Sequence, residues 1–323
     1  MITIEHLTKR YATATVVDDV CMSVERGSLT VIVGTSGSGK STLLRMVNRL
    51  VEPSAGRVSI DGRDTAAEAA HRLRRRIGYV IQGHGLFPHR TVAQNIATVP
   101  RLLGWDEARI RARVLELLGA FSLDPDTYAR MYPHQLSGGQ QQRVGVARAL
   151  AAEPALLLMD EPFGALDPII RAKAQEDLLG IQRRFGTTIL LVTHDIDEAF
   201  RLGDRVAVMS RGRVLQYDRP AALLTRPADP FVTQLTGVAD RALRLLSLTT
   251  AAETLARGGS DAAGDPGAAG GATELTVAAG ASLRDVLSDL AWHGAQAAAV
   301  VDADGGRRGR LTVAAILAHG RAG

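Results

Sequence analysis

The sequence predicts an α/β fold built on a parallel sheet, followed by a small α+β module toward the C-terminal end. Short apolar runs that suit buried strands alternate with stretches in which apolar residues recur at helical spacing. A glycine-rich loop, residues 34–42, lies directly between such a run and such a stretch. The length of 323 residues is sufficient for one large domain and a smaller one.

The order of the elements indicates how the sheet is built. Two apolar runs after residue 153 flank a helical stretch, and a strand–helix–strand order is typical of parallel strands. Residues 1–33 predict short alternating strands, and residues 88–153 are mostly helical, with prolines 100, 125 and 133 separating the segments. The remaining predicted strands are 58–60, 156–159, 189–192, 205–209 and 213–216, and the remaining predicted helices are 43–50, 171–185 and 220–225.

The composition changes after residue 237. Residues 251–272 contain mostly Ala, Gly, Asp and Ser, which carry too little apolar bulk to pack, so they predict a flexible linker. Beyond them, Ser282 is placed to cap a helix with one apolar stripe, and residues 297–301 and 311–313 predict two strands. The expected domains are residues 1–237, a connecting helix and linker at 238–272, and a module at 273–323.

The composition also restricts the class of protein. No apolar stretch approaches the roughly 18 to 20 residues needed to cross a bilayer, and the first residues lack the apolar run of a secretory signal. The formal net charge is +4, but the positive residues are scattered and aromatic residues make up only 4%, which disfavours a nucleic-acid partner. The single cysteine, Cys21, fits a reducing compartment, and its apolar neighbours predict a buried side chain.

The glycine-rich loop has the spacing of a phosphate-binding loop: Gly34, four residues, then Gly39, Lys40 and Ser41. Glycines let backbone N–H groups approach phosphate oxygens, and the following helix directs its N-terminal amides at the same anion. The Lys40 ammonium suits the β- and γ-phosphates, and the Ser41 hydroxyl suits Mg²⁺. The residues expected to bind ATP are Gly34, Thr35, Ser36, Gly37, Ser38, Gly39, Lys40, Ser41 and Thr42, with Lys40 also a catalytic candidate.

Two carboxylates follow the apolar run that ends at Met159. Tips of buried strands in α/β sheets commonly present such groups to a ligand. Asp160 is suited to hold Mg²⁺, and Glu161 is suited to orient and polarise the water that attacks the γ-phosphate. Because a phosphate loop lies in the same chain, we favour these roles over a solvated acidic turn.

A second glycine-rich sequence, Ser137-Gly138-Gly139-Gln140, begins a helical stretch. Its amides are not obstructed by side chains, so it is another potential anion-binding turn. One phosphate group hardly needs two complete turns of this kind from one subunit. We therefore expect the second turn to serve a nucleotide bound mainly by another copy of the chain.

Together these motifs resemble the ATP-binding-cassette (ABC) ATPases, over residues 1–237. Residues 34–42 look like the Walker A loop, residues 156–160 like Walker B with Glu161 as the catalytic carboxylate, and residues 137–140 like the signature motif. The resemblance implies a RecA-like core, an antiparallel β subdomain and a helical subdomain. It also implies a homodimer that holds two ATP molecules, each between one Walker A loop and the partner's signature.

The same resemblance assigns four further positions. Tyr11 looks like the aromatic contact to adenine, and Gln82 like the glutamine that senses Mg²⁺ and the membrane partner. Residues 165–167 look like the D-loop, which makes Asp167 a nucleotide-site residue. His194 looks like the catalytic histidine that contacts the γ-phosphate.

A single ATPase domain without a fused span indicates the separate ATPase subunit of an importer. Residues 77–82, 85–92 and 102–105 look like the subfamily that takes up glycine betaine, choline, carnitine or proline. The resemblance implies transmembrane permease subunits as partners, an extracytoplasmic solute-binding protein indirectly, and a peripheral location at the cytoplasmic face of the inner membrane. The alternatives are an importer of another small solute and a soluble nucleic-acid- or ribosome-associated ABC ATPase.

Residues 273–320 are similar to a single CBS motif, a regulatory unit that normally occurs in pairs. Pairing is therefore expected between subunits. Ala315 stands three residues after Thr312, where nucleotide-binding CBS units often carry Asp. This difference weighs against nucleotide sensing and favours dimerisation or a vestigial role.

Overall fold

The computed structural model describes residues 1–83, 85–164, 166–237, 240–257 and 275–320. The chain divides into two compact units, Met1–Arg219 (unit 1) and Pro220–Gly323 (unit 2). The predicted boundary of the large domain, residue 237, therefore lies inside unit 2. Residues 258–272 of the predicted linker lie outside the described residues.

Unit 1 contains the predicted parallel sheet. Its six strands have the order β10-β9-β3-β8-β7-β6, and all neighbours are parallel except β9 and β10. This arrangement confirms the α/β fold and places the carboxyl ends of β6, β7, β8 and β3 along one edge, where ligands bind in such folds. The strands are β3 (Leu29–Val33), β6 (Ile77–Val80), β7 (Leu156–Asp160), β8 (Thr188–Thr193), β9 (Arg205–Ser210) and β10 (Arg213–Asp218).

A second, antiparallel sheet of unit 1 has the order β2-β1-β4-β5. Its strands are β1 (Ile2–Tyr11), β2 (Ala14–Val24), β4 (Ala55–Ile60) and β5 (Arg63–Asp64). One apolar core contains side chains from both sheets and from the first helix, among them Ile4, Leu44 and Leu190. The glycine loop therefore begins and ends on elements that are fixed by the same core.

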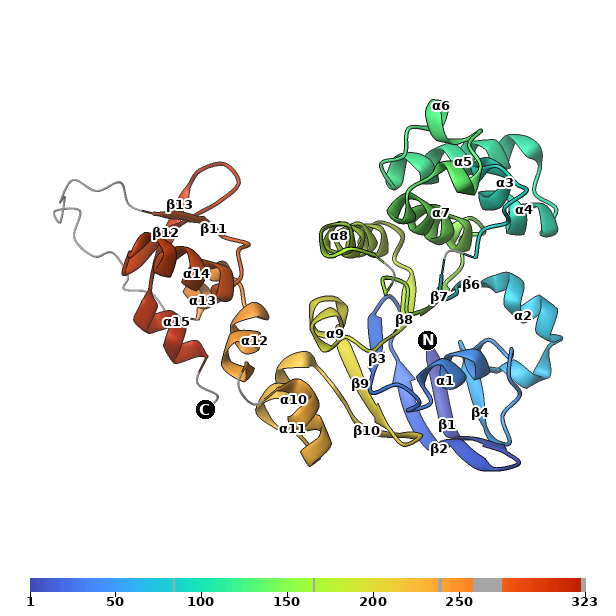
Figure 1. Cartoon of the computed structure of the whole chain (residues 1–323), viewed down its shortest axis with the longest axis horizontal. Helices are drawn as coiled ribbons and strands as arrows, with labels where there is room; N and C mark the ends of the chain where they lie inside the picture. Colours follow the sequence, from blue (N-terminus) through green and yellow to red (C-terminus); the bar gives the residue numbers. More distant parts are fainter. Residues whose placement is uncertain (84, 165, 238–239, 258–274, 321–323) are drawn as a thin grey trace. The chain divides into compact units, whose positions relative to one another are not determined.

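The helices of unit 1 fall into two groups. Helices α3 to α7 gather together, away from the antiparallel sheet (Figure 1), and α7 packs against α3, α5, α8 and β6. Pro100 lies inside α4 and does not separate two segments as predicted, because a short helix accepts proline in its first turn. The helices are α1 (Lys40–Val47), η1 (Thr65–Ala67), α2 (Ala70–Arg76), α3 (Val92–Ile96), α4 (Thr98–Leu102), α5 (Glu107–Ala120), α6 (Pro125–Tyr128), η2 (Pro133–Gln135), α7 (Gly138–Leu150), α8 (Pro168–Phe185) and α9 (Ile196–Leu202).

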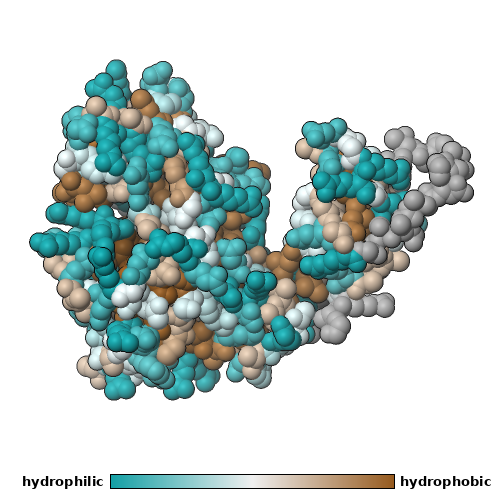
Figure 2. All heavy atoms as spheres, turned by 180° about the vertical axis from the view of Figure 1, so that it is seen from behind, coloured by the Kyte–Doolittle hydropathy of each residue, from teal (hydrophilic) through white to brown (hydrophobic). Residues whose placement is uncertain are grey.

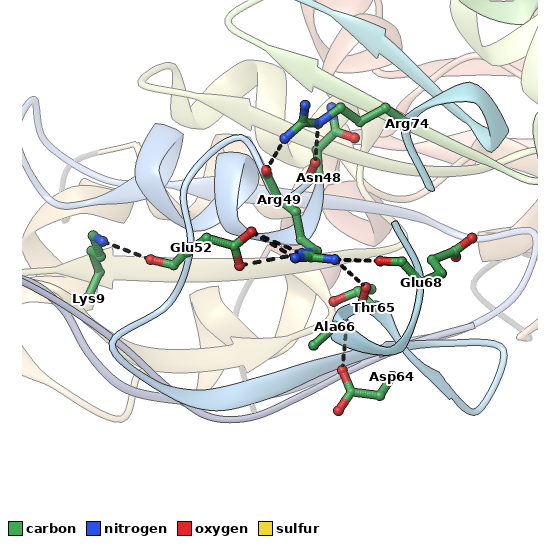
Figure 3. A network of polar contacts seen from close by, with 9 residues as sticks. All are labelled: Lys9, Asn48, Arg49, Glu52, Asp64, Thr65, Ala66, Glu68 and Arg74. Carbon is green, nitrogen blue, oxygen red and sulfur yellow. Dashed lines mark hydrogen bonds and ion pairs between the residues drawn. The ribbon is translucent and has the colours of Figure 1, made fainter. Parts of the chain in front are cut away.

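Arg49 ties the end of α1 to the segment that leads to α2 (Figure 3). Its guanidinium donates to the Glu52 carboxylate at 2.9 Å and to the carbonyls of Thr65 and Glu68 at 3.0 and 2.7 Å. Arg74 on α2 donates in turn to the Arg49 carbonyl. Charged donors that each meet several acceptors make strong hydrogen bonds, so this network holds α1 in a fixed position.

Unit 2 has its own apolar core, which includes Val277, Leu283 and Leu311. Its sheet has the order β11-β12-β13, with a parallel and an antiparallel pair. Ser282 caps α14 through the Asp285 amide, as predicted. The elements are α10 (Pro220–Thr225), α11 (Pro230–Thr236), α12 (Arg241–Ser247), α13 (Ala251–Ala256), β11 (Thr276–Ala278), α14 (Leu283–His293), β12 (Ala297–Val301), β13 (Arg307–Thr312) and α15 (Val313–His319).

Two predictions for unit 2 are wrong in part. Residues 251–256 are a helix rather than flexible linker, because Thr250 and Glu253 form a capping box and Ala251 is buried in the core. The last strand spans residues 307–312 instead of 311–313. It ends at Thr312, whose hydroxyl accepts from the Ala315 amide and starts α15 at Val313.

Hydrophilic side chains cover most of the face of unit 1 seen in Figure 2, and hydrophobic residues show between them as separate patches. Among the described residues, no helix is long and apolar enough to span a membrane. Cys21 is exposed, so the prediction of a buried thiol is wrong. Burial alternates along β2, and Val20 and Met22 occupy the positions that face the core.

Candidate nucleotide-binding site

The glycine loop connects β3 to α1, in the strand–loop–helix context predicted for it. Gly39 has a φ of 100°, and a Cβ there would lie 2.4 Å from the Val16 carbonyl oxygen, so only glycine fits. Lys40 is 5% exposed, and its Nζ donates to the carbonyls of Gly34 and Thr35 at 2.8 and 2.9 Å. The loop thus holds the ammonium at its centre.

Burial lowers the pKa of Lys40, and the negative charges of Glu161 and Asp160 partly oppose this effect. An anion such as a phosphate that enters the loop would further favour the charged form of this ammonium. The loop and its surroundings therefore form a site for a strongly negative ligand.

Asp160 ends β7 and is 2% exposed. Its Oδ1 accepts from the Ser41 hydroxyl at 2.7 Å, and its Oδ2 lies 3.6 Å from an Arg45 nitrogen. The carboxylate at the strand tip therefore faces the first turn of α1. The ion pair with Arg45 was not predicted, because it depends on how α1 packs against the sheet.

Glu161 follows directly and adopts a φ of 46°. Its amide donates to the Val192 carbonyl at 2.9 Å, which fixes the backbone against β8. Its Oε2 accepts from Gln82 Nε2 at 3.5 Å and lies 3.3 Å from His194 Nδ1. Gln82 and His194, which follow β6 and β8, thus both contact the carboxylate of Glu161, which follows β7.

These groups surround a cavity of about 540 Å³, large enough for the phosphates of a nucleotide. The predicted residues Lys40, Glu161 and His194 all face it. The lining consists of Val16, Ser36, Gly37, Gly39, Lys40, Ser41, Thr42, Gln82, Glu161 and His194. Val16 was not predicted, because nothing in the sequence shows that β2 reaches this loop.

Glu198 is a second residue that the sequence did not single out. It lies on α9, four residues after His194, and is 6% exposed. Burial raises its pKa to about 7, and the charge of Asp195 acts in the same direction. The site therefore has a neighbour whose charge changes near neutral pH.

Other predicted site residues lie outside the cavity. Tyr11 ends β1 with its ring half exposed, 5.0 Å from Lys9 Nζ. Asp167 caps α8 and accepts from the Ile169 and Ile170 amides at 3.2 and 3.0 Å. Ala165 of the predicted D-loop lies outside the described residues.

The turn Ser137–Gln140 is also separate from the cavity lining. Ser137 caps α7, and its hydroxyl accepts from the Gln140 amide at 3.4 Å while Gln140 Oε1 accepts from the Ser137 amide at 2.9 Å. A Cβ on Gly139 would lie 2.4 Å from Cγ2 of Ile170, so the turn packs against the start of α8. The signature-like turn and Asp167 therefore border one surface of unit 1.

Comparisons with known proteins show which proteins this chain resembles. A family model described as ABC transporter matches residues 17–164. The glycine betaine uptake system ATP-binding protein YehX of Escherichia coli is 48% identical over 311 residues, which cover 96% of this chain and 97% of that protein. The osmoprotectant import ATP-binding protein OsmV of Salmonella typhimurium is 49% identical over 258 residues, covering 78% of this chain and 67% of that protein.

Among solved structures, a dimeric post-hydrolysis state of the ATP-binding cassette MJ0796 bound to ADP and Pi superposes with a TM-score of 0.61. It is 34% identical and covers 68% of this chain and 99% of its own length.

Proposed function

This chain belongs to the ATP-binding subunits of the ABC transporter family, and from that premise we propose that it drives osmoprotectant import by hydrolysing ATP. The observation that carries the proposal is that Lys40, Ser41, Glu161 and His194 line one cavity. Asp160 is hydrogen-bonded to Ser41 directly behind it. A phosphate loop alone indicates only nucleotide binding. A carboxylate positioned beside it supports hydrolysis.

Mg²⁺ is proposed to bind at Ser41, Asp160 and Gln82. Ser41 and Asp160 already lie in contact, and their hydroxyl and carboxylate oxygens are the hard ligands this ion prefers. When bound with ATP, the ion would neutralise charge on the β- and γ-phosphates. The residues Gly34–Thr42 would hold the phosphates, with Lys40 as the buried cation.

Glu161 is proposed to position the attacking water and accept its proton. Its carboxylate is 23% exposed and contacts both Gln82 and His194, so its orientation is determined by two neighbouring strand ends. A carboxylate held in this way is suited to act on a water in line with the γ-phosphate. His194, 60% exposed on its side chain, lines the same cavity and would contact that phosphate.

A homodimer is proposed to complete each site. Residues Ser137–Gln140 lie outside the cavity of their own subunit, on a surface with the exposed side chain of Ile169. The partner's turn would add its amides and the Ser137 hydroxyl to the phosphates held by residues 34–42. Tyr11 would stack on the adenine from the antiparallel sheet, and Asp167 would lie at the dimer contact.

A membrane permease is proposed to dock beside Gln82. A groove of about 310 Å³ lies there, and its lining includes Tyr79, Ile81 and Phe87. Ile81 and Phe87 are 41% and 39% exposed, which is typical of a surface that a partner covers. Docking here would place the subunit at the cytoplasmic face of the inner membrane and link the partner to Glu161 through Gln82.

The solute is proposed to be glycine betaine or a related osmoprotectant, delivered to the permease by an extracytoplasmic binding protein. The names of the relatives support this choice, and the similarity to YehX extends over unit 2 as well. The single CBS-like module at 273–323 would then pair with its copy in the second subunit. The Thr312 hydroxyl is already used as a helix cap, and Ala315 offers no carboxylate for a ribose.

Uptake of labelled glycine betaine, choline and proline under salt stress tests the proposal. Deletion of the gene should abolish accumulation of at least one solute, and the wild-type chain should restore it. Glu161→Gln should fail to restore it while still co-purifying with the permease. Unchanged uptake of all three solutes in the deletion strain would favour another small solute, and stable recovery with RNA would favour the nucleic-acid-associated class.

A further inference from the structure

Three exposed side chains of different metal-binding types meet on the antiparallel sheet of unit 1. They are His6 on β1 and Asp19 and Cys21 on β2, and one ligand atom from each lies within 4.8 Å of the others. His6 Nδ1 is 2.8 Å from Asp19 Oδ1, and the His6 amide donates to Cys21 Sγ at 3.2 Å. Within the described ranges, this is the one group of His, Cys, Asp and Glu side chains that meets this separation.

The strand geometry explains why the three side chains share a face. Asp19 and Cys21 are exposed on β2 and alternate with the buried Val20 and Met22, so they lie on the side of the sheet away from the core. The register of β1 against β2 shifts between Ile4 and Leu7, and this irregularity brings His6 to the same side. All three are exposed, so the cluster is open to solvent.

Neighbouring groups fix the backbone of the cluster. The buried Thr8 hydroxyl accepts from the Asp19 amide at 3.1 Å and donates to the His6 carbonyl at 3.5 Å. Gly56 on β4 packs so closely that a Cβ there would lie 2.2 Å from the His6 carbonyl oxygen. The ligand-bearing backbone is therefore held from both sides before any ion binds, which lowers the cost of binding.

We propose that His6, Asp19 and Cys21 bind a divalent transition-metal ion of the Zn²⁺ class. Zn²⁺ binds imidazole nitrogen, thiolate sulfur and carboxylate oxygen at about 2.0 to 2.3 Å, which puts ligand atoms about 3 to 4 Å apart. The three ligand atoms lie within 4.8 Å of one another, and rotation of the exposed side chains would close the remaining gap. Sulfur and nitrogen ligands disfavour Mg²⁺, so the ion differs in class from the one proposed beside ATP.

Three protein ligands leave a fourth position for water on the open side of the sheet. The Cys21 thiol gives up its proton when it binds, and the His6 imidazole binds in its neutral form, so affinity should rise with pH. None of the three residues lines the nucleotide cavity. The site is thus separate from ATP hydrolysis and does not depend on the proposed transport function.

Co²⁺ titration of the full, untagged chain tests the site, in the absence of ATP because ATP chelates metal ions. Cys21 is the only cysteine, so a thiolate-to-Co²⁺ charge-transfer band can come only from this residue. We expect one Co²⁺ per chain and displacement of the band by Zn²⁺. Cys21→Ser should abolish the band, and His6→Ala or Asp19→Asn should weaken affinity at least about tenfold. His71→Ala, an exposed histidine on α2, should leave the titration unchanged.

Thiol modification gives an independent readout. Zn²⁺ should slow the reaction of Cys21 with a thiol reagent in the wild-type chain, and this protection should be lost in His6→Ala and Asp19→Asn. The proposal would be overturned by the absence of the Co²⁺ band. It would also be overturned if both variants bound Co²⁺ with wild-type affinity and Zn²⁺ still protected Cys21 in them. The thiol would then bind the ion without His6 or Asp19.

Discussion

Helices α1 and α7 both begin at a glycine-containing turn, but their N-termini are organised differently. At α1, Gly39 provides no side-chain cap, and Lys40, Ser41 and Asp160 surround the first turn. At α7, Ser137 and Gln140 close a capping box. The first turn leaves its amides open within a charged cavity, whereas the second is already stabilised within its own subunit. A glycine-rich helix start is thus a complete phosphate site only where the fold adds a cation and carboxylates.

The largest effect is expected for Glu161→Gln, which alters the cavity at the first turn and leaves the second turn unchanged. We expect ATP hydrolysis to fall about 10²- to 10⁴-fold, because the amide cannot accept a proton from water. ATP binding should persist, since the contacts of Lys40 are unchanged. Steady-state phosphate release and nucleotide binding measure the two effects, with Glu153→Gln, an exposed partner of Arg109, as control. A normal hydrolysis rate would exclude Glu161 as the catalytic base.

Substitution of Lys40 tests the charge at the first turn. Lys40→Ala should weaken ATP affinity about a hundredfold, because a buried charge that faces phosphate is lost. Lys40→Arg should also weaken it, since a planar fork does not fit where the ammonium meets the Gly34 and Thr35 carbonyls. Fluorescent-nucleotide binding measures both. Wild-type affinity in Lys40→Ala would mean that the backbone amides alone hold the phosphates, as in an ordinary helix terminus.

A dependence of stability on pH should also distinguish the two regions. Glu198 is a buried carboxyl near the first turn, and no buried carboxyl is found among the described residues of α7. Its pKa rises from 4.5 to about 7 on folding, chiefly through burial. As pH rises from 4.5 to about 7, the Glu198 carboxyl ionises in the unfolded chain before it ionises in the folded protein, so the free energy of unfolding falls. Above the folded-state pKa no further stability is lost. Between about pH 5 and pH 8 the wild type should lose about 2 kcal/mol of unfolding free energy relative to Glu198→Gln.

Urea unfolding of the wild type and Glu198→Gln at both pH values measures this difference. The same pH dependence in both proteins would show that Glu198 does not carry the effect. Asp195, Arg171 and Glu161 also act on this carboxyl, and their effect on it is removed together with the carboxyl in Glu198→Gln.

The smallest effect is expected for Ser137→Ala at the second turn. Loss of the capping hydroxyl should cost about 1 kcal/mol of unfolding free energy. ATP affinity of the monomer should be unchanged, because Ser137 does not line the cavity of its own subunit. Thermal unfolding and monomer nucleotide binding measure the two quantities. Weaker monomer binding would place Ser137 at its own subunit's nucleotide and remove the distinction between the turns.

Local chemistry explains what the sequence predicted well. The spacing of Gly34, Gly39 and Lys40 depends only on neighbouring residues, so the strand–loop–helix unit follows directly from it. Asp160 was expected at the tip of a strand because the apolar run ends there, and the structure places it as the last residue of β7. The capped helix at Ser282 was also predicted, since its cap and its apolar stripe are local signals.

Other features depend on contacts that are distant in sequence. The pKa of Glu198 is set by burial between α9 and its neighbours, and Arg49 meets Thr65 and Glu68 only after α1 and η1 pack together. Cys21 was placed in the core because its neighbours are apolar, although the alternation along β2 already indicates the opposite face. Helix α13 was missed because its Ala-rich sequence packs only against the core of unit 2.

Mixing two inactive variants tests the central claim most directly. Lys40→Ala destroys the first turn and keeps the second, whereas Ser137→Arg blocks the second and keeps the first. If each ATP lies between the loop at residues 34–42 of one subunit and the turn at 137–140 of its partner, a mixed dimer contains one intact site. The mixture should therefore hydrolyse ATP at a clear fraction of the wild-type rate while each variant alone is inactive. If mixed dimers are shown to form and ATP hydrolysis still does not recover, the shared site is contradicted.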